Sequence, residues 1–336
     1  MATSGLIDVH SHIVPRALPG DPTGGGIDKW PCVQCKSPTA GTVLMGAKPF
    51  REIDERSWDV GRRLADMDRD QVAAQVLSPM PELLSYWIDT APATELARYI
   101  NGAIAEMVTK RPDRFHGLGS VPLQDPERAA EELRLVKERF GLRGVEVGSN
   151  INGRYLGERR FDPFFAAAEE LGLAVFVHSL HPLQAPHLAA TPNLVPFAAF
   201  PVDTALCAAS MIMAGVPERF PRLRFGFSHG GGTLAPILHR LEHGWRATKG
   251  FEGKLPQSPK SYAARFYYDS LVYEAAYLAH LANHIAPGQI FAGTDYPYLI
   301  EQREPAAFIA SVADTVARGD TLWSDAAQRF LGLDAA

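Results

Sequence analysis

Eight short apolar runs, separated by longer stretches, constrain the fold of this chain more than any other feature. The first run is LIDV, and seven more follow after residue 60, near residues 73, 115, 143, 173, 223, 265 and 289. Each run is short, rich in β-branched residues and apolar almost throughout, which is typical of parallel strands buried on both faces. The sequence therefore predicts eight buried strands.

The stretches between these runs have the spacing of helices, as shown by residues 93–111, 126–140 and 161–172. In the second stretch Pro126 follows Asp125, a pair that is typical of a helix N-terminus. Eight strand-then-helix units predict an α/β protein with a (β/α)8 TIM barrel. An open doubly wound sheet is the alternative, but no glycine fingerprint follows the first strand.

Two segments interrupt the alternation. Residues 14–59 form a long insertion after the first strand, and residues 181–200 form a long loop after the fifth. Both follow the C-terminal end of a strand, where barrels hold their active sites, so we expect the insertion to contribute to a site there. We expect residues 1–336 to form a single barrel domain of the length that such barrels commonly have.

Histidines and one aspartate stand where the predicted strands end. His10 and His12 follow the first strand one residue apart, so in extended backbone their side chains share a face. His178 ends the fifth run, His229 ends the sixth and Asp295 ends the eighth. Alone, each would more often be a hydrogen-bonded strand-end residue or a helix cap. Their joint placement at one mouth of a barrel predicts a divalent-metal site, for which imidazole and carboxylate groups are suitable ligands.

Charge and hydropathy give no reason to expect nucleic acid or a membrane as partner. The formal net charge is −5, and we find no run that approaches the apolar length of a bilayer span. The N-terminus, MATSGLIDVH, lacks the basic and apolar regions of a secretory signal, so we expect a cytoplasmic protein. Three cysteines are too few for a disulfide framework, and Cys32 and Cys35 lack the second pair of a structural zinc site.

Taken together, these positions resemble the metal-dependent amidohydrolase superfamily over essentially the whole chain. Within it, the chain is most similar to the decarboxylase branch that includes 2-amino-3-carboxymuconate-6-semialdehyde decarboxylase. The motifs that carry this similarity are MGAKPFRE in the insertion, SHGGGTLAPILHRLEHGWR after the sixth strand and GTDYP after the eighth. One departure is HSLHP after the fifth strand, with Ser179 and Leu180 where the resembling enzymes have Pro-Trp.

The resemblance implies one divalent metal, held by the ligand set His10, His12, His178 and Asp295. His and carboxylate ligands suit zinc, and the sequence leaves manganese, cobalt and iron open. His229 would then not be a ligand but the general base beside a water that the metal activates, with a pKa near the working pH. Asp295 would be both a ligand and part of the proton relay.

The same resemblance implies three substrate residues. Arg51, in MGAKPFR, matches the arginine that binds the substrate carboxylate, a task that suits the planar guanidinium fork. Arg240, in APILHRLEHGW, matches a second arginine that is contributed across a dimer interface, so we expect a homodimer. Phe197 lies in the loop where the resembling enzymes place an aromatic ring near the substrate. The alternative for either arginine is a surface ion pair.

Three functions compete on this basis. The first is metal-dependent non-oxidative decarboxylation of a small unsaturated or aromatic carboxylic acid by a carbon–carbon lyase. The second is hydrolysis of a lactone or amide, because a metal-activated water also attacks carbonyl groups. The third is a metal-binding barrel without activity, which is disfavoured because all five polar groups are intact. The sequence does not name the substrate.

Overall fold

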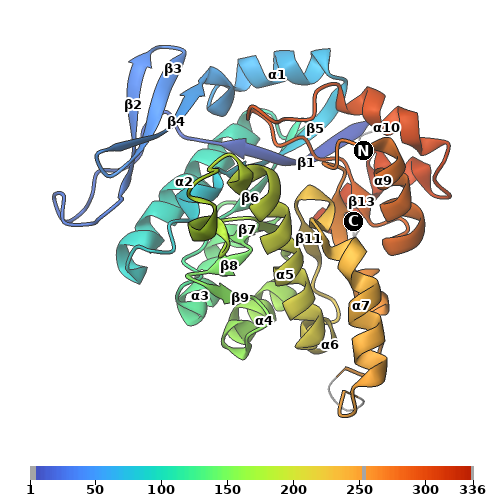
Figure 1. Ribbon diagram of the computed structural model, residues 1–336. Helices are drawn as coiled ribbons and strands as arrows, with labels where there is room; N and C mark the ends of the chain where they lie inside the picture. The colour runs from blue at the N-terminus through green and yellow to red at the C-terminus, as the bar shows by residue number, and fades with distance from the viewer. Residues whose placement is uncertain (1–4, 252–254, 334–336) are drawn as a thin grey trace.

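A closed ring of eight parallel strands lies at the centre of the computed structural model, which describes residues 5–251 and 255–333 (Figure 1). Neighbouring strands pair in the order β1, β5, β6, β7, β10, β11, β12, β13, and every pairing is parallel. Their bounds are β1 Leu6–Ile13, β5 Val72–Pro79, β6 Phe115–Gly119, β7 Gly144–Gly148, β10 Ala174–His178, β11 Phe225–Phe227, β12 Tyr267–Asp269 and β13 Ile290–Phe291. All eight predicted strands are present.

Strands β1 and β13 lie at the two ends of this order. Backbone hydrogen bonds between β1 and the residues that follow β13 close the ring. The amide of Val9 donates to the carbonyl of Ala292 at 2.8 Å, and the amide of His12 donates to the carbonyl of Tyr296 at 2.8 Å. Parallel bridges join the same two segments of chain. The predicted (β/α)8 barrel is confirmed.

Helices follow the strands and cover the outside of the barrel (Figure 1). Asp125 caps one of them by accepting a hydrogen bond from the amide of Arg128, as the Asp-Pro pair predicts. The bounds are α1 Val60–Arg69, α2 Thr90–Lys110, α3 Pro126–Glu138, α4 Asp162–Leu171, α5 Phe200–Met213, α6 Val216–Arg219, α7 Leu234–Ala247, α8 Pro259–Ala263, α9 Ala275–His280, α10 Pro305–Ala313 and α11 Asp325–Leu331.

The insertion after β1 folds into a small antiparallel sheet beside the barrel, drawn in blue in Figure 1. It consists of β2 Pro31–Ser37, β3 Ala40–Met45 and β4 Lys48–Asp54. Cys32 and Cys35 lie three residues apart on β2, so their side chains project from opposite faces of that strand. A second small hairpin, β8 Asn150–Ile151 with β9 Arg154–Tyr155, follows β7.

The loop after β10 is less irregular than its sequence indicates. It contains short helical turns at Ala185–Leu188 and Val195–Ala199, and the second turn continues into α5. Together they give one helix, Val195–Met213, that is long and apolar enough to cross a membrane, with a mean hydropathy of 1.5. The prediction that no run approaches this length is therefore wrong. Half of this helix is buried in the protein, so its apolar residues contribute to the core.

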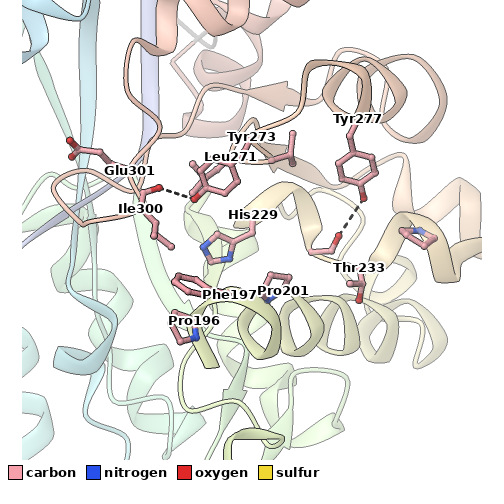
Figure 2. A pocket seen from close by; sticks show the side chains of 13 residues that line it. Pro196, Phe197, Pro201, His229, Thr233, Leu271, Tyr273, Tyr277, Ile300 and Glu301 are labelled. Atoms are coloured by element: carbon pink, nitrogen blue, oxygen red, sulfur yellow. Dashed lines mark hydrogen bonds between the residues drawn. The ribbon is translucent and has the colours of Figure 1, made fainter. Parts of the chain in front are cut away.

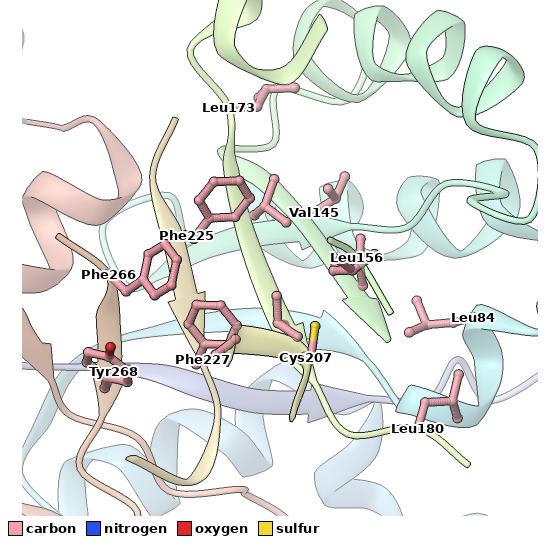
Figure 3. Close-up of a cluster of buried hydrophobic side chains, with 14 of the residues drawn as sticks. Leu84, Val145, Leu156, Leu173, Leu180, Cys207, Phe225, Phe227, Phe266 and Tyr268 are labelled. Atoms are coloured by element: carbon pink, nitrogen blue, oxygen red, sulfur yellow. The ribbon is translucent and has the colours of Figure 1, made fainter. Parts of the chain in front are cut away.

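Apolar side chains fill the barrel in two layers. The outer layer lies between the strands and the surrounding helices and includes Phe225, Phe227 and Phe266 (Figure 3). The inner layer fills the barrel itself, where Phe176 meets Phe330 of α11. The ring of His10 packs on Phe176, with the ring centres 5.2 Å apart. The polar residues of the barrel mouth therefore lie on the layer of apolar side chains that fills the barrel.

Candidate metal centre

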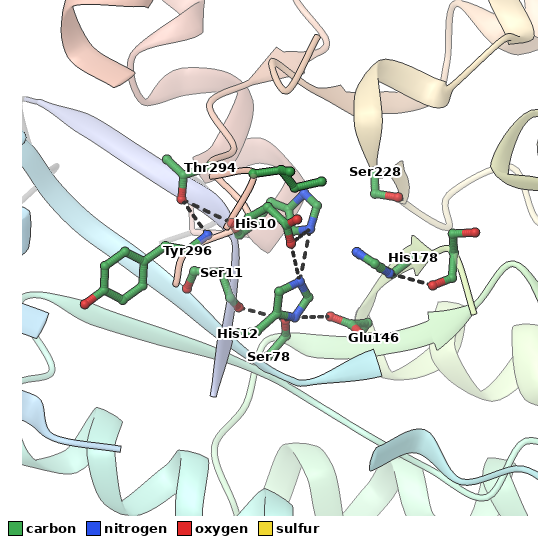
Figure 4. A network of polar contacts seen from close by, with 12 residues as sticks. His10, Ser11, His12, Ser78, Glu146, His178, Ser228, Thr294 and Tyr296 are labelled. Atoms are coloured by element: carbon green, nitrogen blue, oxygen red, sulfur yellow. Dashed lines mark hydrogen bonds and ion pairs between the residues drawn. The ribbon is translucent and has the colours of Figure 1, made fainter. Parts of the chain in front are cut away.

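Three histidines and one aspartate converge at the C-terminal end of the barrel (Figure 4). One ligand atom from each of His10, His12, His178 and Asp295 lies within 4.8 Å of the others, and all four residues are buried. The Nε2 atoms of His10 and His12 are 3.1 Å apart, and Oδ1 of Asp295 lies 3.3 Å and 3.1 Å from them. The predicted convergence of the strand-end residues is present for these four side chains.

These atoms have the donor chemistry of a divalent-metal site. Nε2 of His178 is buried and has no hydrogen-bond partner in the described part of the chain, and the buried Oδ1 of Asp295 lies beside the Nε2 atoms of His10 and His12. Such atoms are costly unless something satisfies them, and a metal ion would satisfy both. Burial by itself lowers the pKa of His10, but its hydrogen bonds with Asp269 and Asp295 raise it to about 10. The site therefore favours a positive charge where a metal would bind.

The remaining ring nitrogens of the three histidines are held from outside the cluster. Nδ1 of His10 lies 2.6 Å from Asp269, and Nδ1 of His12 lies 2.9 Å from the carbonyl oxygen of Pro79. Nδ1 of His178 lies 2.8 Å from the carbonyl oxygen of Ser179. In a neutral imidazole, such contacts favour the tautomer whose Nε2 can bind a metal, so His10 would release its second ring proton when a metal binds.

Asp269 is a site residue that the sequence analysis missed. It lies at the end of β12. Its carboxylate also accepts hydrogen bonds from the backbone amides of His229 and Gly230, at 2.9 Å and 2.7 Å. One carboxylate thus holds both a candidate ligand and the backbone of the candidate base. Its position at a strand end, in YYDS, is the signal that could have identified it.

Glu146 is a second residue that was missed, in the VEVG run of β7. Its Oε2 lies 3.5 Å from Nδ1 of His12, and burial raises its pKa to about 8. Neither carboxyl oxygen has a hydrogen-bond partner among the described residues.

His229 follows β11 and lies beside the cluster without joining it. Its ring centre is 5.1 Å from that of His178 and 5.5 Å from that of His10. Burial of the ring lowers its pKa to about 4, below the near-neutral value expected for a general base. The imidazole is therefore neutral at neutral pH and able to accept a proton.

Both His229 and Asp295 have left-handed backbone conformations, with φ of 57° and 62°. Residues other than glycine rarely adopt this conformation, and where they do, they are enriched at functional sites. Gly232, just after His229, also has no room for a side chain, because a Cβ there would lie 1.8 Å from the carbonyl oxygen of Pro201. The loop after β11 is thus held tightly against the start of α5.

A cavity of about 780 Å³ opens on one side of the cluster, and His229 lies in its wall (Figure 2). The rest of this wall is mainly apolar and comes from the loops after β10, β12 and β13, from the loop after β11 and from the start of α7. Phe197, predicted near the substrate, lines this cavity and is 59% exposed. Other lining residues include Pro196, Pro201, Leu271, Val272, Tyr273 and Ile300.

Polar side chains border the part of the cluster around His12. Tyr298 stacks on the ring of His12, with centres 5.1 Å apart, and the guanidinium of Arg51 lies 4.4 Å from the centre of the Tyr298 ring. The ring of Tyr298 thus lies between Arg51 of the insertion sheet and the candidate ligand His12. Arg240, in contrast, lies exposed on α7 and does not line the cavity beside His229. A single chain does not bring Arg240 to its own site.

The comparison with known sequences agrees with this geometry. Residues 7–333 match the amidohydrolase family. The chain is 35% identical over 332 residues to the 2-amino-3-carboxymuconate-6-semialdehyde decarboxylase of Dictyostelium discoideum, covering 98% of this chain and 92% of that protein.

Solved structures agree as well. The 5-carboxyvanillate decarboxylase of Sphingomonas paucimobilis is 25% identical, with a TM-score of 0.80 over 98% of this chain and 99% of that one. The 5-carboxyvanillate decarboxylase of Novosphingobium aromaticivorans, solved with manganese and 4-hydroxy-3-methoxy-5-nitrobenzoic acid, is 26% identical, with a TM-score of 0.70 over 83% and 82% of the two chains. The three relatives named here are decarboxylases. The barrel, the buried ligand cluster and the match over residues 7–333 show that the chain belongs to the amidohydrolase family.

Proposed function

We propose that this protein is a metal-dependent decarboxylase that removes CO2, without oxidation, from a small unsaturated or aromatic carboxylic acid. The substrate is most like 2-amino-3-carboxymuconate-6-semialdehyde, the compound named for the Dictyostelium relative. The observation that carries this proposal is the buried cluster of three imidazoles and one carboxylate with a neutral imidazole, His229, beside it. This arrangement offers a cation site and a proton-transfer group at the mouth of one cavity.

His10, His12, His178 and Asp295 would hold one divalent cation, which we propose to be zinc. When bound, the cation would polarise the substrate oxygens and stabilise the negative charge that develops during the reaction. Manganese accompanies a relative in its solved structure, so it is the first alternative to test.

The side chains around the cluster have separate tasks. Arg51 pairs with a substrate carboxylate, and the cavity that contains Phe197 receives the hydrocarbon part. His229 and Asp295 relay a proton from water to the substrate carbon that bears the leaving carboxylate, and hydroxide is left behind. The bond between that carbon and the carboxylate then breaks, its electron pair stays with the substrate, and CO2 leaves.

We propose further that the protein works as a homodimer in the cytoplasm, in which Arg240 reaches the neighbouring subunit's site. Support for the dimer is the exposure of Arg240 on α7, where it is not among the residues that line the cavity of its own chain.

The test is a screen of the zinc-loaded protein against carboxylated muconate semialdehydes, hydroxybenzoates and lactones. We expect CO2 to be released from at least one of the carboxylic acids and no acid to be released from the lactones. Proton release from a lactone without CO2 from any acid would replace decarboxylation by hydrolysis. Bound metal without turnover of any compound would leave a metal-binding barrel.

A further inference from the structure

A buried acidic side chain, Glu82, borders the candidate site but has no task in the reaction described above. It lies in the short helical turn Pro81–Leu84 that follows β5, and it is 6% exposed. One carboxyl oxygen, Oε1, lies 3.9 Å from the nearest guanidinium nitrogen of Arg51. We call Arg51, Glu82 and Tyr298 the polar wall.

Three buried polar atoms of the polar wall lack hydrogen bonds within the described part of the chain. They are Nε of Arg51, Oε2 of Glu82 and the hydroxyl of Tyr298. Most buried polar groups in proteins do have a partner, and leaving one unpaired costs about 1 to 3 kcal/mol. Three such atoms on one wall of the barrel mouth indicate that a polar ligand completes them.

The contact between Glu82 and Arg51 does not explain the burial of Glu82. A separation of 3.9 Å is too long for a hydrogen bond, although the two charges attract each other. The same chain shows what a satisfied pair looks like on α3, where Glu132 is 5% exposed and accepts two hydrogen bonds from Arg98, each at 2.8 Å. Glu82 has the burial of Glu132 without its hydrogen bonds.

The neighbours of Glu82 indicate what kind of group would complete it. Arg51 offers donors to a carboxylate, and Glu82 beside it offers an acceptor oxygen whether or not its carboxyl group is ionised. Because these two side chains lie less than 4 Å apart, a small ligand that carries an acceptor and a donor close together can meet both.

We infer that Glu82 determines substrate specificity by accepting a hydrogen bond from an amino or hydroxyl group that neighbours the carboxylate bound by Arg51. This inference rests on the proposed function and deepens it, because it states which carboxylic acids the site prefers. A site built to bond a donor discriminates against ligands that lack it, because its own buried acceptor is then left unpaired.

The test compares the binding of three ligands that differ only in this donor: benzoate, 2-hydroxybenzoate and 2-aminobenzoate. Their dissociation constants would be measured by calorimetry with zinc-loaded wild-type protein, Glu82→Gln and Glu82→Met. We expect the wild type to prefer the donor-bearing ligands over benzoate. Glu82→Met should reduce this preference by about tenfold or more, the worth of a hydrogen bond to a charged group, and Glu82→Gln should reduce it less because its amide oxygen still accepts.

Glu132→Gln is the matched control, because it neutralises another buried glutamate, which lies on α3 and is paired with Arg98 outside the polar wall, and it should leave the preference at the wild-type value. Zinc content would be measured in every variant. An unchanged preference in both Glu82 variants would overturn the inference, as would a wild type without preference. Equal weakening of all three ligands would show that Glu82 acts only by positioning Arg51. A wild type that binds with this preference but releases no CO2 would contradict the proposed reaction. The role of Glu82 in ligand preference would still be supported.

Discussion

The two sides of the metal cluster differ in chemistry and in origin. On one side the polar wall comes from the insertion, from the turn after β5 and from the loop after β13. On the other side the cavity is mainly apolar and is built chiefly by the loops after β10, β12 and β13. Both sides meet at the ligands, where Tyr298 stacks on His12 and His229 packs beside His178.

This difference teaches how a small acid would lie in the site. Its charged and hydrogen-bonding groups would point to the polar wall, because burying them in the cavity would leave them unpaired. Its hydrocarbon part would lie in the cavity, where leaving water is favourable. Changes at Glu82 should therefore alter the choice among acids, whereas changes at Arg51 or in the cavity should alter the affinity for all of them alike.

The largest effect should follow from removing one of the ligands at which the two sides meet. His178→Ala deletes one candidate ligand, so we expect the variant to lose most of its bound metal and its activity toward every acid. Elemental analysis after reconstitution with zinc measures the first and CO2 release the second. Full metal occupancy in this variant, or two metals per wild-type chain, would contradict the four-residue site.

The next effect should separate chemistry from metal binding on the cavity side. His229→Ala should keep its metal, because the ring lies beside the cluster without joining it. Turnover should fall by about 10² to 10⁴-fold, the usual worth of a positioned acid–base group. Metal content and kcat should be measured on the same preparation, since joint loss of both would make His229 a ligand.

A smaller effect is expected on the polar wall. Arg51→Ala should weaken binding of every carboxylate by about tenfold or more, because a charged hydrogen bond is lost. Metal content should stay at the wild-type value, and the change should appear in KM or in ligand affinity. A loss confined to kcat would place Arg51 outside the binding step.

Arg240 offers a sharper version of this experiment. If it acts across a dimer interface, a mixture of Arg240→Ala chains with Arg51→Ala chains contains some dimers in which one site has both arginines. Activity should then partly return once the subunits exchange. If activity does not recover in a mixture that has exchanged subunits, Arg240 acts only within its own chain or has no role in the reaction.

The smallest effect is expected at the edge of the cavity. Phe197 is 59% exposed, so Phe197→Ala removes only a modest apolar contact with a bound acid. A loss of about 1 kcal/mol corresponds to a KM about fivefold higher, with kcat unchanged. The rise should be the same for acids with and without a neighbouring donor. A change in the preference between them would break the division between the two sides.

The sequence was sufficient to predict the barrel and the four converging residues, because each lies near the C-terminal end of a strand and these ends meet at one mouth. The structure differs in detail, since β1 extends past His10 and His12 to Ile13 and β13 ends before Asp295. Asp269 obeys the same rule and could have been included. Glu82 could not, because its role depends on distances to Arg51 and Tyr298, which distant segments bring close. The low pKa of His229 likewise depends on burial, which spacing does not reveal.

The closure of the barrel between β1 and β13 has a consequence for folding during synthesis on the ribosome. His10 and His12 emerge among the first residues, but Asp295 and the strand that closes the ring emerge among the last. A nascent chain that ends before Asp295 has three of the four ligands and lacks the backbone hydrogen bond between His12 and Tyr296 that helps to close the ring. Metal capture must therefore wait until nearly the whole chain has been made, and a shortened chain that ends before Asp295 cannot acquire the centre by keeping its histidines.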